Sequence, residues 1–470
     1  MKLLLISGAV SGVKRYGNLE DIGSYLPPYG LCCLGAVLEK AGHEVMIIDS
    51  VRHPLSLLAL AEKVKQFQPE LIGLSVYSIG ANQAIETATA IKSEFGIPIV
   101  AGGPHVMVFP EDLAQCDAFD YLVTGEGEYS LLELVETIES GGDLERVQGI
   151  YFHRDGEVVK NEPRPLLDNL DDLPYPAFHL IKGIETYAPH QMVYRRKPVV
   201  TLITSRGCPF QCIFCNSVWT HRWRGNSAAY VVGLVEHVIE EFGAREVSFH
   251  EDTFALNRRR VLEICRLMKE RGIRIPWTAT VNLTTLDREV IKAMKDAGCW
   301  LVSCGIESGS DEVLRFIHKP VDKETVRRVL GWLSDEGIRI RGYFMIGHLI
   351  ETRETIQETI DFARSLPLYS MNISVMYLAP GSKAREIAHE YGSTNMSLDI
   401  GSSYQRGNLG FVPRGLTAEY IQEMHRKAIV DFFVRPRQFM RLASAIRGPE
   451  DIRRYYRLVR SFFKVVRAKA

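Results

Sequence analysis

The sequence predicts an α/β protein made of a doubly wound, Rossmann-like domain, a (β/α)6 partial TIM barrel and a helical C-terminal region. Two regions, residues 1–140 and 195–385, each alternate short runs of Val, Ile and Leu with segments of helical period. This alternation is typical of parallel sheets covered by helices. A third observation is a loop with three closely spaced cysteines, at residues 208–215, near the start of the second region.

The composition is that of an ordinary globular protein. The chain has 470 residues, 46% of them hydrophobic, and 56 Lys+Arg against 57 Asp+Glu give a net charge of -1. This balance excludes a disordered or collagen-like chain and argues against a general nucleic-acid binder. No apolar run reaches the ~20 residues that span a bilayer, and the first residues lack a signal-peptide pattern. We therefore expect a cytoplasmic protein.

Five apolar runs within residues 1–140 are expected to form one parallel sheet. They are residues 2–8, 44–50, 70–78, 97–103 and 121–128. The segments of helical period are residues 28–43, 55–69, 81–96 and 130–142. Sheets of this kind bind ligands at the C-terminal ends of their strands.

Loops at three of these strand ends are candidates for ligand binding. They are residues 75–78, 102–105 and 124–127, and the last two are rich in glycine. Glycine permits positive φ and lets the backbone approach a flat ligand closely, although the same loops could be simple tight turns. The G-x-G-x-x-G fingerprint is absent after the first strand. An ordinary dinucleotide site is therefore not expected.

Residues 141–194 are expected to form a connector, with a small hairpin around Asp155-Gly156 and then an extended, proline-rich passage. Strand–helix repeats of about 30 residues follow. The expected strands are residues 199–207, 246–252, 275–282, 300–309, 340–348 and 370–380, and the expected helices are residues 228–244, 258–272, 287–299, 325–337 and 353–367. Six strands in such repeats favour a partial barrel over a second open sheet.

Three of the nine cysteines differ from the rest in their spacing. Cys208, Cys212 and Cys215 form a C-x3-C-x2-C pattern, whereas most of the others lie in apolar runs typical of core thiols. A structural zinc site normally has four protein ligands, which a nearby histidine such as His221 could complete. Three thiolates on a [4Fe–4S] cluster instead leave one iron open to an external ligand. The spacing favours the cluster.

This cysteine motif, with Phe214 at its aromatic position, resembles that of the radical S-adenosylmethionine (SAM) superfamily. The resemblance covers about residues 195–385 and implies a [4Fe–4S] cluster on the three cysteines and a SAM site at the barrel strand ends. The implied SAM contacts are Phe214, Glu251, Asp252, Asn282, Ser303, Glu307 and Gly347. The acidic residues could instead be helix caps or solvated turns. One departure is the sequence GHLIET at residues 347–352, where relatives often have Gly-x-Pro-Gly-Glu-Thr.

Residues 1–140 resemble the cobalamin-binding domain that precedes the barrel in one large subgroup of this superfamily. The implied cobalamin contacts are Ser75, Tyr77, Ser78, Gly102, Gly103, His105, Thr124, Gly125, Glu126 and Gly127. The Asp-x-His-x-x-Gly pattern of other cobalamin domains is missing. We therefore expect no histidine on the lower face of cobalt, where Tyr77 is a candidate neighbour.

The combined resemblance implies a cobalamin-dependent radical SAM enzyme. Such an enzyme reductively cleaves SAM to a 5′-deoxyadenosyl radical and transfers a methyl group, by way of methylcobalamin, to an unactivated carbon. An alternative is an oxidative cyclase or ring-rearranging enzyme with the same cofactors and a tetrapyrrole- or lipid-type substrate. A remote alternative is a cobalamin-responsive sensor or electron-transfer module. A small-molecule or lipid-like substrate and an external electron donor of the flavodoxin or ferredoxin type are the expected partners.

The C-terminal region changes in charge along its length. Residues 386–424 contain a Gly/Ser-rich loop and a helix start at which Thr417 is the expected N-cap. Residues 425–470 contain 13 Lys+Arg and 3 Asp+Glu, interleaved with aromatic and aliphatic residues. This pattern predicts basic amphipathic helices that make peripheral contact with the inner membrane face or surround an anionic substrate. The alternative is a set of helices that cap the barrel.

Overall fold

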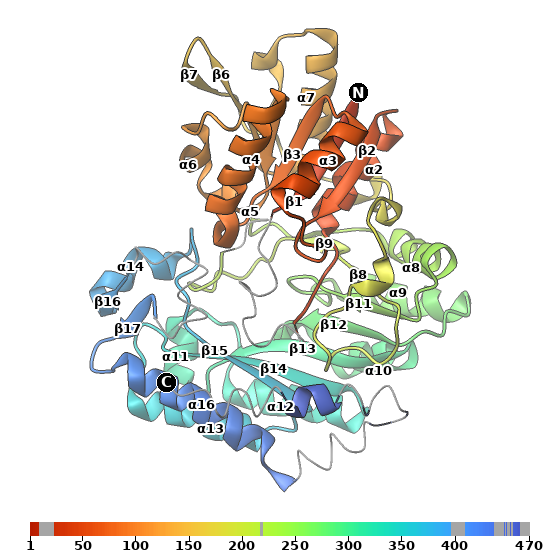
Figure 1. The fold of residues 1–470 in the computed structure, drawn as a ribbon. Coiled ribbons are helices and arrows are strands. Elements are labelled where there is room, and N and C mark those ends of the chain that lie inside the picture. The colour runs from red at the N-terminus through yellow and green to blue at the C-terminus, as the bar shows by residue number, and fades with distance from the viewer. Residues whose placement is uncertain are drawn as a thin grey trace. The chain divides into compact units, whose positions relative to one another are not determined.

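A computed structural model describes residues 1–8, 23–216, 220–395 and 409–436, together with residues 446, 448, 452 and 455–460. The chain divides into two compact units, whose elements are labelled in Figure 1. The first unit comprises the described residues of Met1–Arg15 and Tyr25–Tyr187, and the second comprises chiefly those of Ala188–Ala470. Each unit has a parallel sheet of its own.

The sheet of the first unit has the order β2-β1-β3-β4-β5-β6-β7. Its strands are β1 (Lys2–Ser7), β2 (Glu44–Asp49), β3 (Leu71–Ser75), β4 (Ile99–Gly102), β5 (Tyr121–Val123), β6 (Ile150–Arg154) and β7 (Glu157–Lys160). The first five strands are parallel, in the order typical of a doubly wound fold. The expected Rossmann-like fold is therefore confirmed.

Helices connect these parallel strands. They are α2 (Tyr29–Lys40), α3 (Leu57–Phe67), α4 (Ala81–Phe95), α5 (Pro104–Val108), α6 (Pro110–Ala114) and α7 (Gly127–Ser140). The short 3-10 turns are η2 (Ser78–Gly80), η3 (Leu144–Arg146), η4 (Leu170–Asp172), η5 (Phe178–Leu180) and η6 (Ile184–Thr186). The sequence analysis did not anticipate α5 and α6, which both begin with proline at a position where its missing N–H costs nothing.

The hairpin predicted inside the connector is present as β6 and β7. Asp155 and Gly156 form its turn with φ of 52° and 82°, the left-handed values that a two-residue hairpin turn requires. Strand β6 pairs antiparallel with β5, so the hairpin extends the sheet of the first unit. That unit consequently continues to Tyr187, well beyond the expected start of a connector at residue 141.

The second unit has a six-stranded sheet of order β15-β14-β13-β12-β11-β8, with all neighbouring strands parallel. The strands are β8 (Val199–Leu202), β11 (Glu246–Phe249), β12 (Trp277–Val281), β13 (Cys299–Glu307), β14 (Arg339–Ile346) and β15 (Ser370–Val375). Strands β8 and β15 are the two edges, so the barrel is open. The expected (β/α)6 partial barrel is confirmed. Two short antiparallel pairs are β9 (Ser205–Arg206) with β10 (Arg224–Gly225) and β16 (Gly392–Thr394) with β17 (Phe411–Pro413).

Helices cover the outer side of this sheet (Figure 1). They are α8 (Ala228–Phe242), α9 (Arg258–Glu270), α10 (Arg288–Asp296), α11 (Asp311–Phe316), α12 (Lys323–Asp335), α13 (Arg353–Ser365), α14 (Lys383–Tyr391) and α16 (Ala418–Phe433), with one 3-10 turn, η7 (Leu283–Thr285). Seven of them begin at a polar side chain that accepts a backbone N–H of the first turn: Ser227, Asn257, Asp287, Asp322, Thr352, Ser382 and Thr417. Such caps fix where each helix leaves the loop that follows its strand.

The C-terminal region is described only in part. Helix α16 packs on β15, and the hydroxyl of Thr417 accepts the Tyr420 N–H at 3.2 Å, as the expected N-cap should. Residues 437–445 and 461–470, which carry many of the basic charges, lie outside the described residues, as does most of the Gly/Ser-rich loop. Among the described residues, no helix combines the length and apolar character needed to cross a membrane.

Candidate functional site

The cysteine loop follows β8 and is held by backbone hydrogen bonds to two other segments of the unit. Ile213 donates its N–H to Ile317 at 3.1 Å and accepts the N–H of Ala384 at 2.8 Å. Gly207 has φ of 85°, and a Cβ there would lie 2.3 Å from the Arg222 carbonyl oxygen. Only glycine therefore fits at the start of this loop. The loop places Cys208, Cys212 and Cys215 in one segment, and none of the three forms a disulfide.

The three thiols share one electrostatic environment. Desolvation raises the pKa of Cys215 to about 12, with further increases from Cys212, Asp252 and Cys208. Desolvation also raises the pKa of Cys212, against the lowering effect of the Lys319 ammonium. Thiols with raised pKa values in a partly buried loop are protonated on their own and become thiolates on binding a metal. This is the donor set that an iron–sulfur cluster requires.

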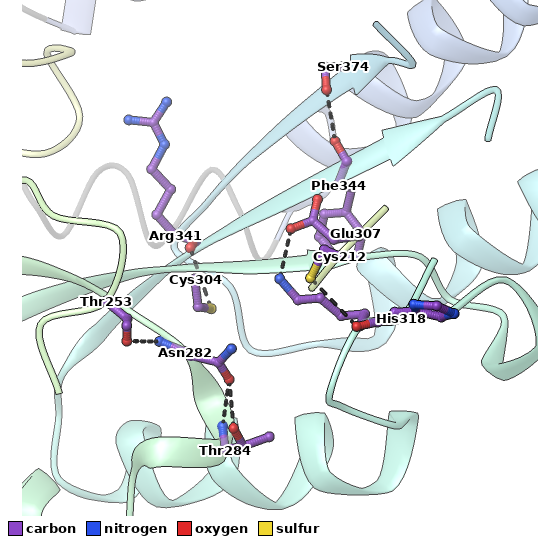
Figure 2. Close-up of polar contacts among 11 residues, drawn as sticks. Cys212, Thr253, Asn282, Thr284, Cys304, Glu307, His318, Arg341, Phe344 and Ser374 are labelled. Carbon is purple, nitrogen blue, oxygen red and sulfur yellow. Dashed lines mark hydrogen bonds and ion pairs between the residues drawn. The ribbon is translucent and has the colours of Figure 1, made fainter. Parts of the chain in front are cut away.

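A buried ion pair lies beside this loop. The Lys319 ammonium is 3.0 Å from an oxygen of Glu307, at the end of β13. The Cys212 thiol donates to the carbonyl oxygen of His318 at 3.6 Å, so the loop contacts the segment that carries the lysine. Figure 2 shows Cys212, Glu307 and His318 in one group. Sequence analysis identified Glu307 but missed Lys319, because a single lysine near a helix end usually indicates a solvated surface.

The close contact between Glu307 and Lys319 depends on local backbone geometry. Glu307 has φ of 70°, in the left-handed region that non-glycine residues rarely adopt. A Cβ at Gly305 would lie 2.2 Å from Oε1 of Glu307 and 2.8 Å from Nζ of Lys319. The ends of both side chains therefore lie in the space that a side chain at residue 305 would enter. Residues held in such uncommon conformations are concentrated at functional sites.

Glu251 and Asp252 follow β11, and they have different surroundings. The buried Glu251 carboxylate accepts the Thr204 N–H at 2.8 Å and is also bonded to the hydroxyls of Thr204 and Ser205. It therefore holds the chain segment that leads into the cysteine loop. Asp252 is exposed and acts electrostatically on Cys208 and Cys215. Desolvation, together with the charge of Glu251, raises the pKa of Asp252.

The other implied SAM contacts lie on neighbouring barrel strands. Asn282 follows β12, where its side chain accepts the Thr284 N–H at 3.0 Å and its own N–H donates to Thr253 at 3.3 Å (Figure 2). Ser303 is a buried residue of β13, and a shift in the pairing with β14 separates it from Glu307 along the strand. Both positions belong to the strands that surround the Glu307–Lys319 pair. Their role as SAM contacts stays a prediction.

The turn after β14 carries an unusual buried pair. The Glu351 carboxylate accepts the backbone N–H groups of Gly347 and His348, and desolvation raises the pKa of Glu351 to about 8 in spite of these bonds. His348 is completely buried, and desolvation lowers its pKa to about 3. Its ring lies 5.9 Å from that of Phe214, edge to face, which connects this turn to the cysteine loop. Sequence analysis named Phe214 and Gly347 but not His348 or Glu351.

In the first unit, the candidate cobalamin loops lie at the C-terminal ends of three adjacent parallel strands, β3, β4 and β5. Ser75 ends β3 and Gly102 ends β4. Gly103 has φ of 95°, and a Cβ there would lie 2.9 Å from the Ser75 hydroxyl oxygen. The two loops are therefore in direct contact.

A buried histidine reinforces this contact. His105 Nδ1 lies 3.0 Å from the Ser78 hydroxyl oxygen, and desolvation lowers the pKa of His105, with Asp112 acting in the opposite sense. Tyr77, in the loop after β3, is 44% exposed. It is thus one of the exposed large side chains at this edge of the sheet.

The third loop, after β5, combines an anchored carboxylate with an open glycine. Glu126 accepts the Leu167 N–H at 2.7 Å, and the Thr124 hydroxyl donates to the Gly149 carbonyl at 3.1 Å. Gly125 has φ of 72°, and a Cβ there would meet no atom within 4 Å. Gly127 begins helix α7. These hydrogen bonds therefore hold the loop in place. At Gly125 no other described residue covers the side on which a Cβ would lie.

Comparison with known proteins connects the two units to two families. Residues 202–363 match the radical SAM superfamily, and residues 17–135 match the B12 binding domain. An uncharacterized methyltransferase of Pyrococcus horikoshii is 32% identical over 443 residues, which cover 93% of each chain. The chain belongs to the B12-binding radical SAM family. The [4Fe–4S] cluster, SAM and cobalamin are the cofactors of such proteins.

Other relatives of this B12-binding radical SAM protein are named for different activities. A cytidylyl-2-hydroxyethylphosphonate methyltransferase of Streptomyces wedmorensis is 27% identical over 88% of both chains. An anaerobic magnesium-protoporphyrin IX monomethyl ester cyclase of Rubrivivax gelatinosus is 28% identical over 74% of this chain and 63% of its own. Among solved structures, the cobalamin-dependent SAM radical enzyme OxsB has a TM-score of 0.74 at 17% identity, covering 98% of this chain and 71% of its own. The methyltransferase TsrM from Kitasatospora setae has a TM-score of 0.68 at 19% identity, over 90% and 82%. These two likenesses support the fold.

The described residues fit the cofactors of the family. Three thiols in one loop, beside a buried ammonium, suit a cluster that keeps one iron open. The open backbone at Gly125 and the adjoining loops at Ser75 and Gly103 suit a flat ligand at the edge of the sheet. The cysteine loop and these strand-end loops are therefore the candidate positions for the cluster and for cobalamin.

Proposed function

We propose that this B12-binding radical SAM protein transfers a methyl group to an unactivated carbon of a small-molecule substrate. The observation that carries the proposal is the three-cysteine loop beside the Glu307–Lys319 pair, in a chain that aligns over nearly its full length with a methyltransferase. When bound, the cluster supplies an electron for SAM cleavage, and cobalamin carries the methyl group. The protein contributes binding, orientation and protection from water.

Each unit has its own part in this proposal. The α/β domain at residues 1–140 would hold cobalamin with the loops at 75–78, 102–105 and 124–127. The barrel at residues 195–385 would hold the cluster on Cys208, Cys212 and Cys215. Glu307, Asp252 and Asn282, together with the aromatic face of Phe214, would position SAM beside it. The loops of both units follow the C-terminal ends of parallel strands, where such folds bind ligands, and this supports the proposal.

The finer partners are part of the proposal. Reductive SAM cleavage requires an electron from outside the chain, and a flavodoxin or ferredoxin would supply it. The basic segment at residues 425–470 would make peripheral contact with an anionic membrane surface, for which its composition is the support. Binding to vesicles with and without anionic lipid, compared at low and high salt, tests this contact.

The decisive experiment uses SAM with a deuterated methyl group. Reconstituted protein is incubated without oxygen, with cobalamin, a strong reductant and no acceptor. The proposal expects deuterated methyl on cobalamin, S-adenosylhomocysteine and 5′-deoxyadenosine, all measured by mass spectrometry. Deoxyadenosine without labelled cobalamin would favour the alternative hypothesis of a cyclase. The similarity to the cyclase of Rubrivivax gelatinosus is the reason to test that hypothesis. If cluster-loaded protein forms neither deoxyadenosine nor labelled cobalamin, the assignment as an enzyme is overturned.

Cysteine variants give this experiment its controls. Replacing Cys208, Cys212 or Cys215 with Ala should abolish deoxyadenosine formation and lower the iron and sulfide content. Cys116→Ala is the matched control, because Cys116 is a partly buried free thiol of the other unit. Its iron content and product yield should equal those of the wild type.

A further inference from the structure

A buried arginine inside the barrel unit lacks a counter-charge. Arg341 lies on β14 and is 9% exposed. Its Nε has no hydrogen-bond partner, and no carboxylate among the described residues lies within ion-pair distance of its guanidinium. Figure 2 shows the side chain directed away from the group formed by Cys212 and Glu307. Arg341 is therefore distinct from the residues placed around the cluster.

Two other buried cations of this unit, Lys319 and Arg260, are compensated by oxygen acceptors of the chain. Lys319 pairs with Glu307. Arg260, 7% exposed, donates to the Asn226 carbonyl at 2.7 Å and to the carbonyl and hydroxyl oxygens of Thr204 at 2.9 and 2.7 Å. An uncompensated buried charge is costly, so buried charges normally have a partner. For Arg341 that partner has to come from outside the described chain.

The neighbours of Arg341 offer hydrogen-bond donors of their own. Ser303 of β13 and Ser370 of β15 are its register partners on either side, and partners in parallel strands project from the same face. Ser370 is 1% exposed, and its hydroxyl has no partner. The guanidinium lies 5.2 Å from the centre of the Tyr343 ring, which restrains its orientation. These three residues, side by side on adjacent strands, thus present one guanidinium and two hydroxyls.

Two histidines face this charge and stay neutral at physiological pH. Desolvation and the Arg341 charge lower the pKa of His190 to about 3. The same two causes, in that order, lower the pKa of His250. Arg341 is consequently the charged group that acts on both histidines. The surroundings favour an anion.

We propose that Arg341, with the hydroxyls of Ser303 and Ser370, binds the anionic group of the methyl acceptor, a carboxylate, phosphate or phosphonate. The planar fork of arginine matches these groups with two parallel hydrogen bonds. This inference rests on the proposed function and narrows its substrate class to organic anions. The methionyl carboxylate of SAM is the other anionic group that this arginine could bind. The direction of Arg341, away from Cys212 and Glu307, favours the acceptor.

Inorganic phosphate and acetate are the probes for this subsite. Unfolding temperature of the holoenzyme is followed by tryptophan fluorescence at constant ionic strength, because all five tryptophans lie between residues 219 and 332. A ligand that binds only the folded state raises this temperature with its concentration. Wild type should gain stability with phosphate or acetate, and Arg341→Gln should weaken the apparent affinity at least about tenfold. Arg341→Lys keeps the positive charge but lacks the planar guanidinium. Its apparent affinity for these anions should therefore lie between those of the wild type and Arg341→Gln.

Arg339→Gln is the matched control, since Arg339 precedes Arg341 by two residues on β14 and stacks on Tyr369 at 4.6 Å. It should keep the wild-type response. An equal response of wild type and Arg341→Gln, or none in wild type, would overturn the proposal. SAM affinity, measured by equilibrium dialysis, should change less than about twofold in Arg341→Gln; a loss that matches the phosphate effect would assign the arginine to SAM instead. Methyl labelling of cobalamin in the absence of an acceptor tests the proposed function separately. A failure of the anion-site proposal can therefore be distinguished from a failure of the proposed methyl transfer.

Discussion

The Lys319 ammonium and the Glu307 carboxylate lie 3.0 Å apart, and their side chains are only 12% and 11% exposed. Desolvation lowers the pKa of Lys319, but the charges of Glu307 and Cys212 outweigh it and raise the pKa overall. The pair connects the end of β13 to the segment that contacts the cysteine loop through His318. A change in either residue should therefore affect stability and the geometry of the loop together.

Lys319→Met should destabilise the barrel unit because it leaves the Glu307 carboxylate buried without a partner. Breaking such a pair from one side typically costs about 3–5 kcal/mol. The double variant Lys319→Met/Glu307→Gln should recover part of this loss, since it removes the orphaned charge as well. Urea unfolding followed by tryptophan fluorescence measures both effects. Lys323→Met is the control, because the Lys323–Asp311 pair is 4.0 Å long and more exposed, and its loss should cost about 1 kcal/mol or less. A double variant no more stable than the single would contradict this account.

Gly305→Ala should displace the same ion pair without removing any charge. The new Cβ would come within 2.2 Å of the Glu307 carboxylate and 2.8 Å of the Lys319 ammonium. Crowding of this kind typically costs about 1–3 kcal/mol, and we expect SAM affinity to fall as well. Gly331→Ala is the matched control, since Gly331 lies in helix α12 with nothing within 4 Å of its Cβ position. Equal unfolding free energies and SAM affinities for the two variants would show that the space around Gly305 is unimportant.

The fold could be predicted because many of its strands are mostly apolar and alternate with segments of helical period. The β8 residues Val199–Leu202 are all buried, as expected when helices cover a parallel sheet. The pairing of the β6–β7 hairpin could not be predicted in the same way. Its turn residues, Asp155 and Gly156, specify a hairpin but carry no information on which sheet edge accepts it. The sequence therefore did not show that this hairpin extends the sheet of the first unit.

The cysteines could be found from spacing, and the surrounding side chains could not. Lys319 reaches Glu307 because of a left-handed backbone conformation at a glutamate, which no periodicity reveals. Arg341 lies in a strand whose charged residues alternate with apolar ones, a pattern that also fits a half-solvated strand. His348 and Glu351 are buried polar residues in a segment rich in apolar neighbours. Their environment depends on packing between distant elements.

The cobalamin site gives a spectroscopic prediction. No Asp-x-His-x-x-Gly motif is present, and His105 is already bonded to Ser78 in the buried part of its loop. We therefore expect no histidine nitrogen on cobalt. Electron paramagnetic resonance of the Co(II) form, prepared with natural and with 15N-labelled histidine, checks this directly. The two spectra should have the same superhyperfine pattern. A splitting that changes with the nitrogen isotope would identify a histidine ligand and contradict the prediction.

Glu351 should make the stability of the barrel unit fall as pH rises. Burial raises its pKa from 4.5 to about 8, so between these values the folded state holds a proton that the unfolded state has lost. Stability is then highest at low pH and decreases by about 1.4 kcal/mol per pH unit until the folded state also ionises. His348 acts in the opposite direction: its pKa is lowered from 6.5 to about 3, so it stops contributing to the slope above pH 6.5.

The pH window from 6.5 to 8 therefore separates Glu351 from His348. Glu351→Gln keeps an oxygen for the N–H groups of Gly347 and His348 but carries no titrating proton. Its unfolding free energy, relative to wild type, should rise by about 2 kcal/mol across this window. Glu354→Gln is the control, because Glu354 is exposed in the next turn and its pKa is lowered, which leaves it ionised in both states above pH 6.5. Urea unfolding at pH 6.5, 7, 7.5 and 8 measures all three proteins. If the Glu351→Gln difference stays constant over this range, the carboxyl is ionised in the folded protein, and the two backbone N–H bonds outweigh its burial.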